Sequence, residues 1–290
     1  MSTPRSEPLP TANGVASGAK CTFDLELGWL YRRITLLVSC AAGNKTFDEI
    51  ISDIWLTVNG KPQRTHTAVE LNEINGLHDQ DLTVKTVGSI TGGDYVAYLP
   101  ICLAETYRKN VENGLGLGWN AVGINALQLQ VQFRTVTGPS ISGLMVREPG
   151  VAGRGLGPIT KWKRQYIPAT GTPQDYSKIF AQTSVDNFLQ SLHLWPSSGT
   201  ARYVNRAELK FNGSLYHDRT YLHNQAELLF NGMNPDLRAA PRYDLVVDES
   251  DAVGDPPNLR NSNGHNLKLT FDAAPSGNVT VITQETGLPE

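Results

Sequence analysis

One motif occurs twice in this sequence and constrains the fold more than any other feature. The first copy comprises the alternating segment Ile54–Val58, the pair Asn59-Gly60, a polar run and the segment Thr67–Gly76. A second copy follows about 155 residues later. Its corresponding segments are Ala207–Phe211, Asn212-Gly213 and Asn224–Gly232. Each copy is typical of a strand, a tight turn and a short helix, so we expect a duplicated domain.

The two expected helices have matching start and stop signals. Thr67 and Asn224 are the expected N-caps, and each is followed three residues later by a glutamate that completes a capping box. Asn75-Gly76 and Asn231-Gly232 are expected to end the helices, because both residue types tolerate the left-handed conformation. A further short helix is expected over Glu105–Asn113.

Most of the remaining chain has the period-two hydrophobicity of strands with one solvated face. The expected strands outside the motif are Cys21–Leu27, Arg33–Cys40, Tyr95–Ile101, Leu127–Phe133, Gly143–Arg147, Phe188–Trp195, Tyr243–Val247, Leu267–Phe271 and Val279–Thr283. The pattern predicts an all-β protein with a few short helices, built as two tandem jelly-roll β-sandwiches, a double jelly roll.

Length and composition agree with two domains. A chain of 290 residues holds two domains of ordinary size. Its 40% apolar content and net charge of −3 indicate a soluble globular protein without the basic excess of a nucleic-acid binder. The expected divisions are a flexible N-terminal arm over 1–20, a first jelly roll over 21–150, a linker and entry segment over 151–187, and a second jelly roll over 188–290. The three cysteines favour buried thiols, with a Cys21–Cys40 disulfide as the alternative.

This layout resembles a known family of virus proteins. The resemblance rests on Tyr31–Ile34 leading to Val58-Asn59-Gly60 in the first half, and on Ile159–Tyr166 leading to Phe211-Asn212-Gly213 in the second. The layout is similar to the double jelly-roll major capsid proteins of tailless, membrane-containing double-stranded DNA bacteriophages, of the corticovirus type within the adenovirus and tectivirus lineage. An insertion around Asp248–Asn263 departs from the pattern of the first half.

The resemblance implies a structural function without enzymatic activity. Homotrimers would form pseudo-hexagonal capsomers that build an icosahedral shell over an internal membrane enclosing double-stranded DNA. The implied partners are other copies of the chain, vertex or penton proteins, minor capsid proteins and the internal viral membrane, with no direct sequence-specific binding to nucleic acid. The implied location is the virion capsid, after synthesis in the host cytoplasm.

Two groups of residues are candidates for these contacts. The first, Lys161, Trp162, Lys163 and Arg164, combines basic and aromatic side chains, a composition that suits a lipid surface or a neighbouring subunit. A solvated strand edge is the alternative for this group. The second group consists of apolar helix residues that would lie either in the domain core or at subunit contacts. Its members are Val69, Leu71, Ile74, Leu228, Leu229 and Phe230.

No cofactor is expected from the sequence. An acidic segment that starts at Asp244 could hold Ca²⁺ between subunits, but its spacing does not match an EF-hand loop and a solvated loop is the preferred interpretation. The other acidic residues of this segment are Asp248, Glu249, Asp251 and Asp255.

Two other classes remain open. Double β-sandwiches also occur in enzymes such as amidases and copper monooxygenases, although the six histidines show no HxH or HExxH spacing and no GxSxG motif is present. A carbohydrate- or receptor-binding module is the third class, because Trp29, Trp119 and Trp195 could stack on sugars. Each tryptophan lies in or beside an apolar segment, which favours packing.

Overall fold

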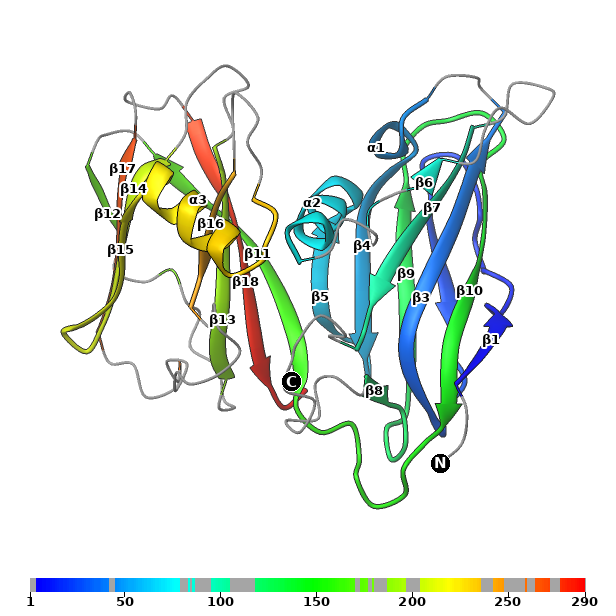
Figure 1. Cartoon of the computed structure of the whole chain (residues 1–290). Coiled ribbons are helices and arrows are strands. Elements are labelled where there is room, and N and C mark those ends of the chain that lie inside the picture. The colour runs from blue at the N-terminus through cyan, green and yellow to red at the C-terminus, as the bar shows by residue number, and fades with distance from the viewer. Residues whose placement is uncertain are drawn as a thin grey trace. The chain divides into compact units, whose positions relative to one another are not determined.

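The chain folds into two compact units. The computed structural model describes residues 4–41, 45–78, 83, 85–86, 95–104, 118–169, 173–176, 179, 187–196, 204–235, 242–247, 259, 264–271 and 277–289. Unit 1 comprises Met1–Thr160 with Pro289–Glu290, and unit 2 comprises Lys161–Leu288 (Figure 1). The expected linker and entry segment over 151–187 contains the strands Ile159–Ala169 and Gln174–Tyr176.

Unit 1 is a sandwich of two antiparallel sheets. In one sheet the strand order is β1-β10-β3-β7-β6, with β8 also paired to β3, and in the other the order is β5-β4-β9-β2. The strands are β1 (Arg5–Pro8), β2 (Lys20–Asp24), β3 (Trp29–Cys40), β4 (Ile51–Val58), β5 (Lys61–Thr67), β6 (Lys85–Thr86), β7 (Tyr95–Cys102), β8 (Trp119–Asn120), β9 (Leu127–Phe133) and β10 (Ser140–Pro149). Its helices are α1 (Phe47–Ile50) and α2 (Ala68–His78).

Unit 2 has the same construction. One sheet has the order β16-β13-β18-β11 and the other β12-β17-β14-β15. The strands are β11 (Ile159–Ala169), which starts two residues before the unit, β12 (Gln174–Tyr176), β13 (Asn187–Pro196), β14 (Val204–Phe211), β15 (Ser214–Thr220), β16 (Tyr243–Val246), β17 (His265–Phe271) and β18 (Gly277–Gly287). Helix α3 (Tyr221–Phe230) packs against β14, β15 and β16.

The strand orders establish the duplication. The order β2-β9-β4-β5 in unit 1 matches β12-β17-β14-β15 in unit 2, and β7-β3-β10 matches β16-β13-β18. Helix α2 follows β5 as α3 follows β15. The repeated motif of the sequence is therefore the β4-β5-α2 segment and its β14-β15-α3 counterpart, and the prediction of two jelly-roll sandwiches is confirmed.

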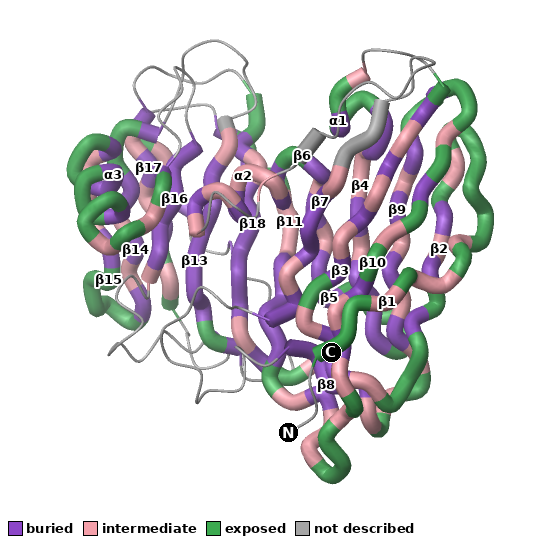
Figure 2. Tube along the Cα trace, turned by 45° about the vertical axis from the view of Figure 1, so that its right-hand side comes forward, coloured by how far each residue is buried: buried purple, intermediate pink, exposed green. Residues whose placement is uncertain are grey.

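Alternating apolar residues form the cores. Along β9 the exposure alternates strictly, with Leu127, Leu129, Val131 and Phe133 buried and the glutamines between them partly exposed (Figure 2). Strand β17 repeats this pattern in unit 2. Because each large apolar side chain contributes roughly 1.5–3 kcal/mol when fully buried, the buried row of each strand is a main source of stability for its own unit.

The Asn-Gly turns have the expected geometry. Asn59 and Asn212 have φ angles of 51° and 48°, and the glycines that follow have 81° and 82°. Two successive left-handed residues define the type I′ turn that suits the twist of a two-stranded hairpin. Both hairpin predictions are confirmed.

The helix ends agree with the prediction only in part. Glu70 N–H donates to Thr67 Oγ1 at 3.1 Å and Thr67 N–H donates to Glu70 Oε2 at 2.7 Å, so the first capping box is present. Helix α2 nevertheless continues past Gly76 to His78. The expected helix over 105–113 lies outside the described residues.

The prediction for the start of α3 was wrong. Thr220 is its N-cap, with Oγ1 accepting from His223 N–H at 3.4 Å. Asn224 lies inside the helix, fully buried, and its Nδ2 donates to the Asp244 carbonyl of β16 at 2.7 Å. Asn75 of α2 makes the equivalent contact with the Pro100 carbonyl of β7 at 2.9 Å. A buried amide that fastens the helix to a strand thus occurs in both units.

Part of the N-terminal segment 1–20, which the sequence predicted to be a flexible arm, forms a strand. Residues Arg5–Pro8 form β1, which pairs with β10, and Arg147 Nε donates to Glu7 Oε2 at 2.8 Å. Cys21 and Cys40 are buried, and no disulfide forms between any of the three cysteines. Among the described helices, none has the length and hydrophobicity needed to cross a membrane.

Candidate functional site

The basic and aromatic segment of β11 is less accessible than its composition suggested. Lys161 and Trp162 are buried, at 1% and 5% exposure, and Lys161 Nζ donates to Asn187 Oδ1 at 3.0 Å. These two side chains therefore do not face a lipid surface or solvent. The sequence could not reveal this because the partner amide lies on another strand, β13.

The other two members of the segment are half-buried. Lys163 Nζ lies 3.4 Å from Glu285 Oε2 on β18. The Arg164 guanidinium lies 4.9 Å from the centre of the Tyr166 ring, and Tyr166 is 58% exposed. Arg164 and Tyr166 therefore present most of the solvent-exposed surface of this segment. The expected contact with a lipid surface or a neighbouring subunit is limited to these two residues and Lys163.

The candidate helix residues fall into two classes. Leu71, Ile74 and Leu228 are fully buried and belong to the domain cores. Val69, Leu229 and Phe230 are exposed, at 39%, 51% and 88%. The structure thus separates core positions from surface positions within the set that the sequence proposed.

Helix α3 carries an exposed apolar surface that extends the predicted set. Leu222 is 76% exposed, and Ala226 is exposed one turn further along the same side. We call Leu222, Ala226, Leu229 and Phe230 the α3 outer face. Their spacing of four, seven and eight residues from Leu222 places them on one side of a helix. Figure 2 shows exposed residues along this helix. The spacing was visible in the sequence, but an N-cap placed at Asn224 left Leu222 outside the helix.

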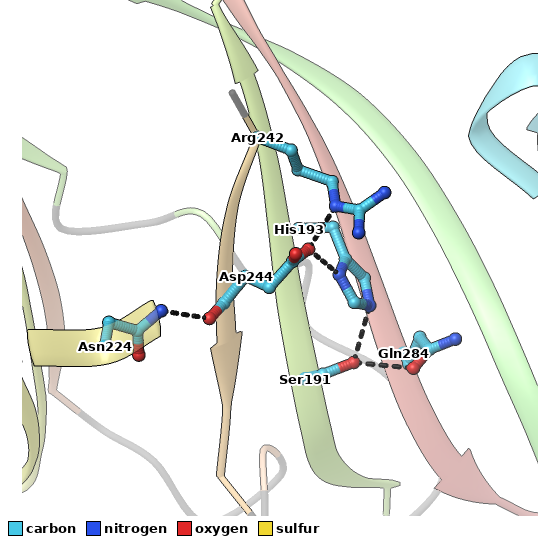
Figure 3. A network of polar contacts seen from close by, with 6 residues as sticks. All are labelled: Ser191, His193, Asn224, Arg242, Asp244 and Gln284. Carbon is cyan, nitrogen blue, oxygen red and sulfur yellow. Dashed lines mark hydrogen bonds and ion pairs between the residues drawn. The ribbon is translucent and has the colours of Figure 1, made fainter. Parts of the chain in front are cut away.

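A polar network inside unit 2 has the spacing of a catalytic triad. Ser191 Oγ lies 2.9 Å from His193 Nε2, and His193 Nδ1 lies 2.6 Å from Asp244 Oδ1 (Figure 3). Arg242 donates to the same Asp244 oxygen, and Ser191 Oγ donates to Gln284 Oε1 at 2.6 Å. The sequence did not indicate this cluster, because its members come from three strands or their ends and no local motif joins them.

The network does not form a catalytic site in this structure. Ser191, His193 and Asp244 are 2%, 0% and 0% exposed, so a substrate cannot reach the serine hydroxyl. The neighbouring Arg242 guanidinium, together with the His193 contact, outweighs desolvation and lowers the pKa of Asp244 to about 2. The paired carboxylate joins β16 to β13, and the Ser191 contact with Gln284 extends the network to β18.

The calcium hypothesis has little support from the described residues. Asp244 is buried and paired, while Asp248, Glu249, Asp251 and Asp255 lie outside the described residues. Within the described part of the chain, no group of three or more histidine, cysteine, aspartate or glutamate side chains is arranged to hold a metal ion.

Comparison with known proteins identifies the first unit. Residues 6–147 match the family described as viral coat protein P2 N-terminal domain. The first unit therefore contains a viral coat protein P2 N-terminal domain. No curated protein sequence matches this coat protein.

Solved structures show that the fold extends over the whole coat protein. The major capsid protein P2 of bacteriophage PM2 is 15% identical, with 99% of this chain and 98% of that chain covered and a TM-score of 0.78. The capsid model of the virus PBCV-1 is 14% identical, covering 98% and 93%, with a TM-score of 0.66. The structure of Sulfolobus Turreted Icosahedral Virus is 10% identical, covering 99% and 92%, with a TM-score of 0.69.

The family assignment decides between the open classes. The match to a viral coat protein domain indicates a structural, non-enzymatic role. The protein's functional surfaces therefore include contacts between copies of the chain in the capsid.

Proposed function

We propose that this coat protein is a major capsid protein whose homotrimers form pseudo-hexagonal capsomers. The duplication carries this proposal, because both units have the same strand orders in their two sheets. Three copies around one axis place six similar sandwiches in a ring, so a threefold oligomer becomes a nearly sixfold tile. The similar PM2 protein is itself described as a major capsid protein.

The proposed assembly is an icosahedral shell over an internal membrane enclosing double-stranded DNA. Support comes from the structures with similar folds, one of which belongs to a virus described as icosahedral. Vertex or penton proteins and minor capsid proteins complete the proposed set of partners. The protein is made in the host cytoplasm in this proposal and carries no sequence-specific site for nucleic acid.

The α3 outer face is the proposed contact with a neighbouring copy of the chain. This face exposes four apolar residues to water, including Phe230 at 88% exposure. A contact with another subunit would bury this apolar surface. Aromatic side chains are enriched at the centres of such interfaces. Val69 of α2 is exposed to a smaller extent and is a second proposed contact.

Native mass measured by light scattering tests the trimer. A single species at three times the chain mass of 31.7 kDa, stable on dilution, is the expected result. Phe230→Asp should shift the mass toward one chain, while its free energy of unfolding changes by less than about 0.5 kcal/mol because the residue is exposed. Leu215→Asp adds the same carboxylate at an exposed apolar position of β15, outside the α3 outer face, and should remain a trimer. A monomeric wild type would refute the proposal.

Lys163 and Arg164 remain the proposed contact with the membrane or with a neighbouring subunit. Binding of the trimer to vesicles rich in anionic lipid should weaken when both are changed to glutamine, because the charged contacts with the headgroups are lost. The double variant Lys61→Gln with Arg33→Gln also removes one lysine and one arginine charge at exposed positions and is the matched control. Equal binding of all three proteins would exclude a lipid contact at this segment.

A further inference from the structure

Three buried polar side chains of unit 2 form a chain of contacts across one sheet. Lys161 lies on β11, Asn187 on β13 and Glu285 on β18, and β18 is the strand between the other two. Their exposures are 1%, 0% and 2%. Lysine and glutamate are seldom buried to this degree unless they are paired, so this cluster requires an explanation.

The contacts orient the asparagine amide between the other two groups. Lys161 Nζ donates to Asn187 Oδ1 at 3.0 Å, and Asn187 Nδ2 donates to Glu285 Oε2 at 2.7 Å. The carbonyl side of the amide thus faces the amine, while its nitrogen faces the carboxylate. Thr283 Oγ1 donates to Glu285 Oε1 at 3.0 Å, which fixes the carboxylate from its other side.

This arrangement contains the groups needed for amide exchange. An amine held within about 3–3.5 Å of its target in a fixed orientation gains a large effective concentration. Transfer of one proton from the amine to the carboxylate would give a nucleophilic amine and a carboxylic acid that can donate a proton. A carboxyl group in hydrogen-bond reach of the leaving nitrogen can act as general acid and base.

We propose that Lys161 and Asn187 form an intramolecular isopeptide bond, with Glu285 transferring the protons. Glu285 takes up one ammonium proton, and the neutral Nζ attacks Asn187 Cγ to form a new N–C bond while the carbonyl electron pair moves to Oδ1. When the carbonyl re-forms, the Cγ–Nδ2 bond breaks. Nδ2 leaves as ammonia after receiving, through Glu285, the proton that Nζ loses. An amine and an amide become one substituted amide and ammonia, and no oxidant or other reagent is consumed.

The bond would join β11 to β13 covalently across β18. The two residues are 26 positions apart in the sequence, so the cross-link closes a loop that includes the start of unit 2. Closing a loop reduces the freedom of the unfolded chain, as a disulfide does, but this bond cannot be reduced. It goes beyond the proposed capsid function, since it concerns the integrity of one chain and not its partners.

Mass spectrometry of a tryptic digest tests the bond directly. A linked Lys161 resists trypsin, so the expected product is a branched peptide that joins residues 155–163 to residues 179–202 and is lighter by one ammonia than the sum of its two parts. The intact mass alone is insufficient, because succinimide formation at Asn59-Gly60 or Asn212-Gly213 also releases ammonia. Recovery of the two peptides unlinked from folded wild-type protein would overturn the proposal.

Three variants separate the roles. Lys161→Arg removes the nucleophilic amine, and Glu285→Gln removes the acid and base while keeping the side-chain shape, so both should lack the branched peptide. Lys268→Arg changes a half-buried lysine of β17, in the other sheet of unit 2, and should still yield it. A branched peptide in Glu285→Gln would overturn the role of Glu285. Its presence in Lys161→Arg would overturn the assignment of the linked lysine.

Discussion

At the residue scale, tertiary partners decide the environments that composition leaves open. His217 lies in β15 among polar neighbours, and the sequence does not distinguish it from the other five histidines. In the structure it is 5% exposed, with Nε2 2.9 Å from the Tyr243 hydroxyl, which donates to the Arg219 carbonyl at 2.9 Å. Lys161 and Ser191 are similar cases, since each is buried against residues from other strands.

Burial of His217 predicts an acid-sensitive fold. Desolvation, with a smaller effect from Arg219, lowers the pKa of His217 from its ordinary 6.5 to about 3. Between these values the unfolded chain binds a proton that the folded chain does not, so stability falls as the pH falls through this window. Urea unfolding between about pH 7 and pH 5, where carboxylates remain charged, should show this loss. His217→Gln should flatten the slope, and an unchanged slope would contradict the assignment.

At the element scale, local signals placed the hairpins and one helix start correctly. The Asn-Gly turns after β4 and β14 and the Thr67 capping box involve residues at most three positions apart, so the sequence contains the information needed to predict them. The α3 start was misplaced because Asn224 is held by β16, a partner that is distant in the sequence. Gly76 remains inside α2, although its residue type favours a helix end.

The two hairpin turns should differ in their tolerance of substitution. Asn59→Ala places a β-carbon without a polar group in a left-handed position, at a cost of roughly 1–2 kcal/mol. It also removes the Oδ1 that accepts from Asn125 N–H at 2.8 Å and from Ala126 N–H at 3.1 Å. Asn212 Oδ1 accepts from the Gly264 N–H at the longer distance of 3.3 Å. Chemical denaturation should therefore show a larger loss for Asn59→Ala than for Asn212→Ala.

Glycine variants serve as the controls for this comparison. Asn59→Gly removes the side-chain acceptor without left-handed strain, so it should recover part of the stability that Asn59→Ala loses. An alanine variant as stable as the glycine variant would show that the left-handed conformation contributes nothing at this turn.

At the scale of the whole molecule, the duplication was predictable and the division between its halves was not. Alternating apolar strands in the same order indicated two sandwiches, which the matching sheet orders confirm. The unit boundary at Thr160 and Lys161 falls within β11, a continuous strand, so no change in composition marks it. Strand β1 was missed because its pairing with β10 spans nearly the whole first unit.

Averaged electron-microscope images of the purified native oligomer test the capsomer proposal most directly. Each chain contributes two sandwiches with the same strand order, so the account predicts a ring of six similar lobes with threefold symmetry. Phe230→Asp prepared in parallel should yield two-lobed particles. Two-lobed particles from the wild-type protein, or rings without threefold symmetry, would contradict the proposal that this coat protein builds a shell from trimers.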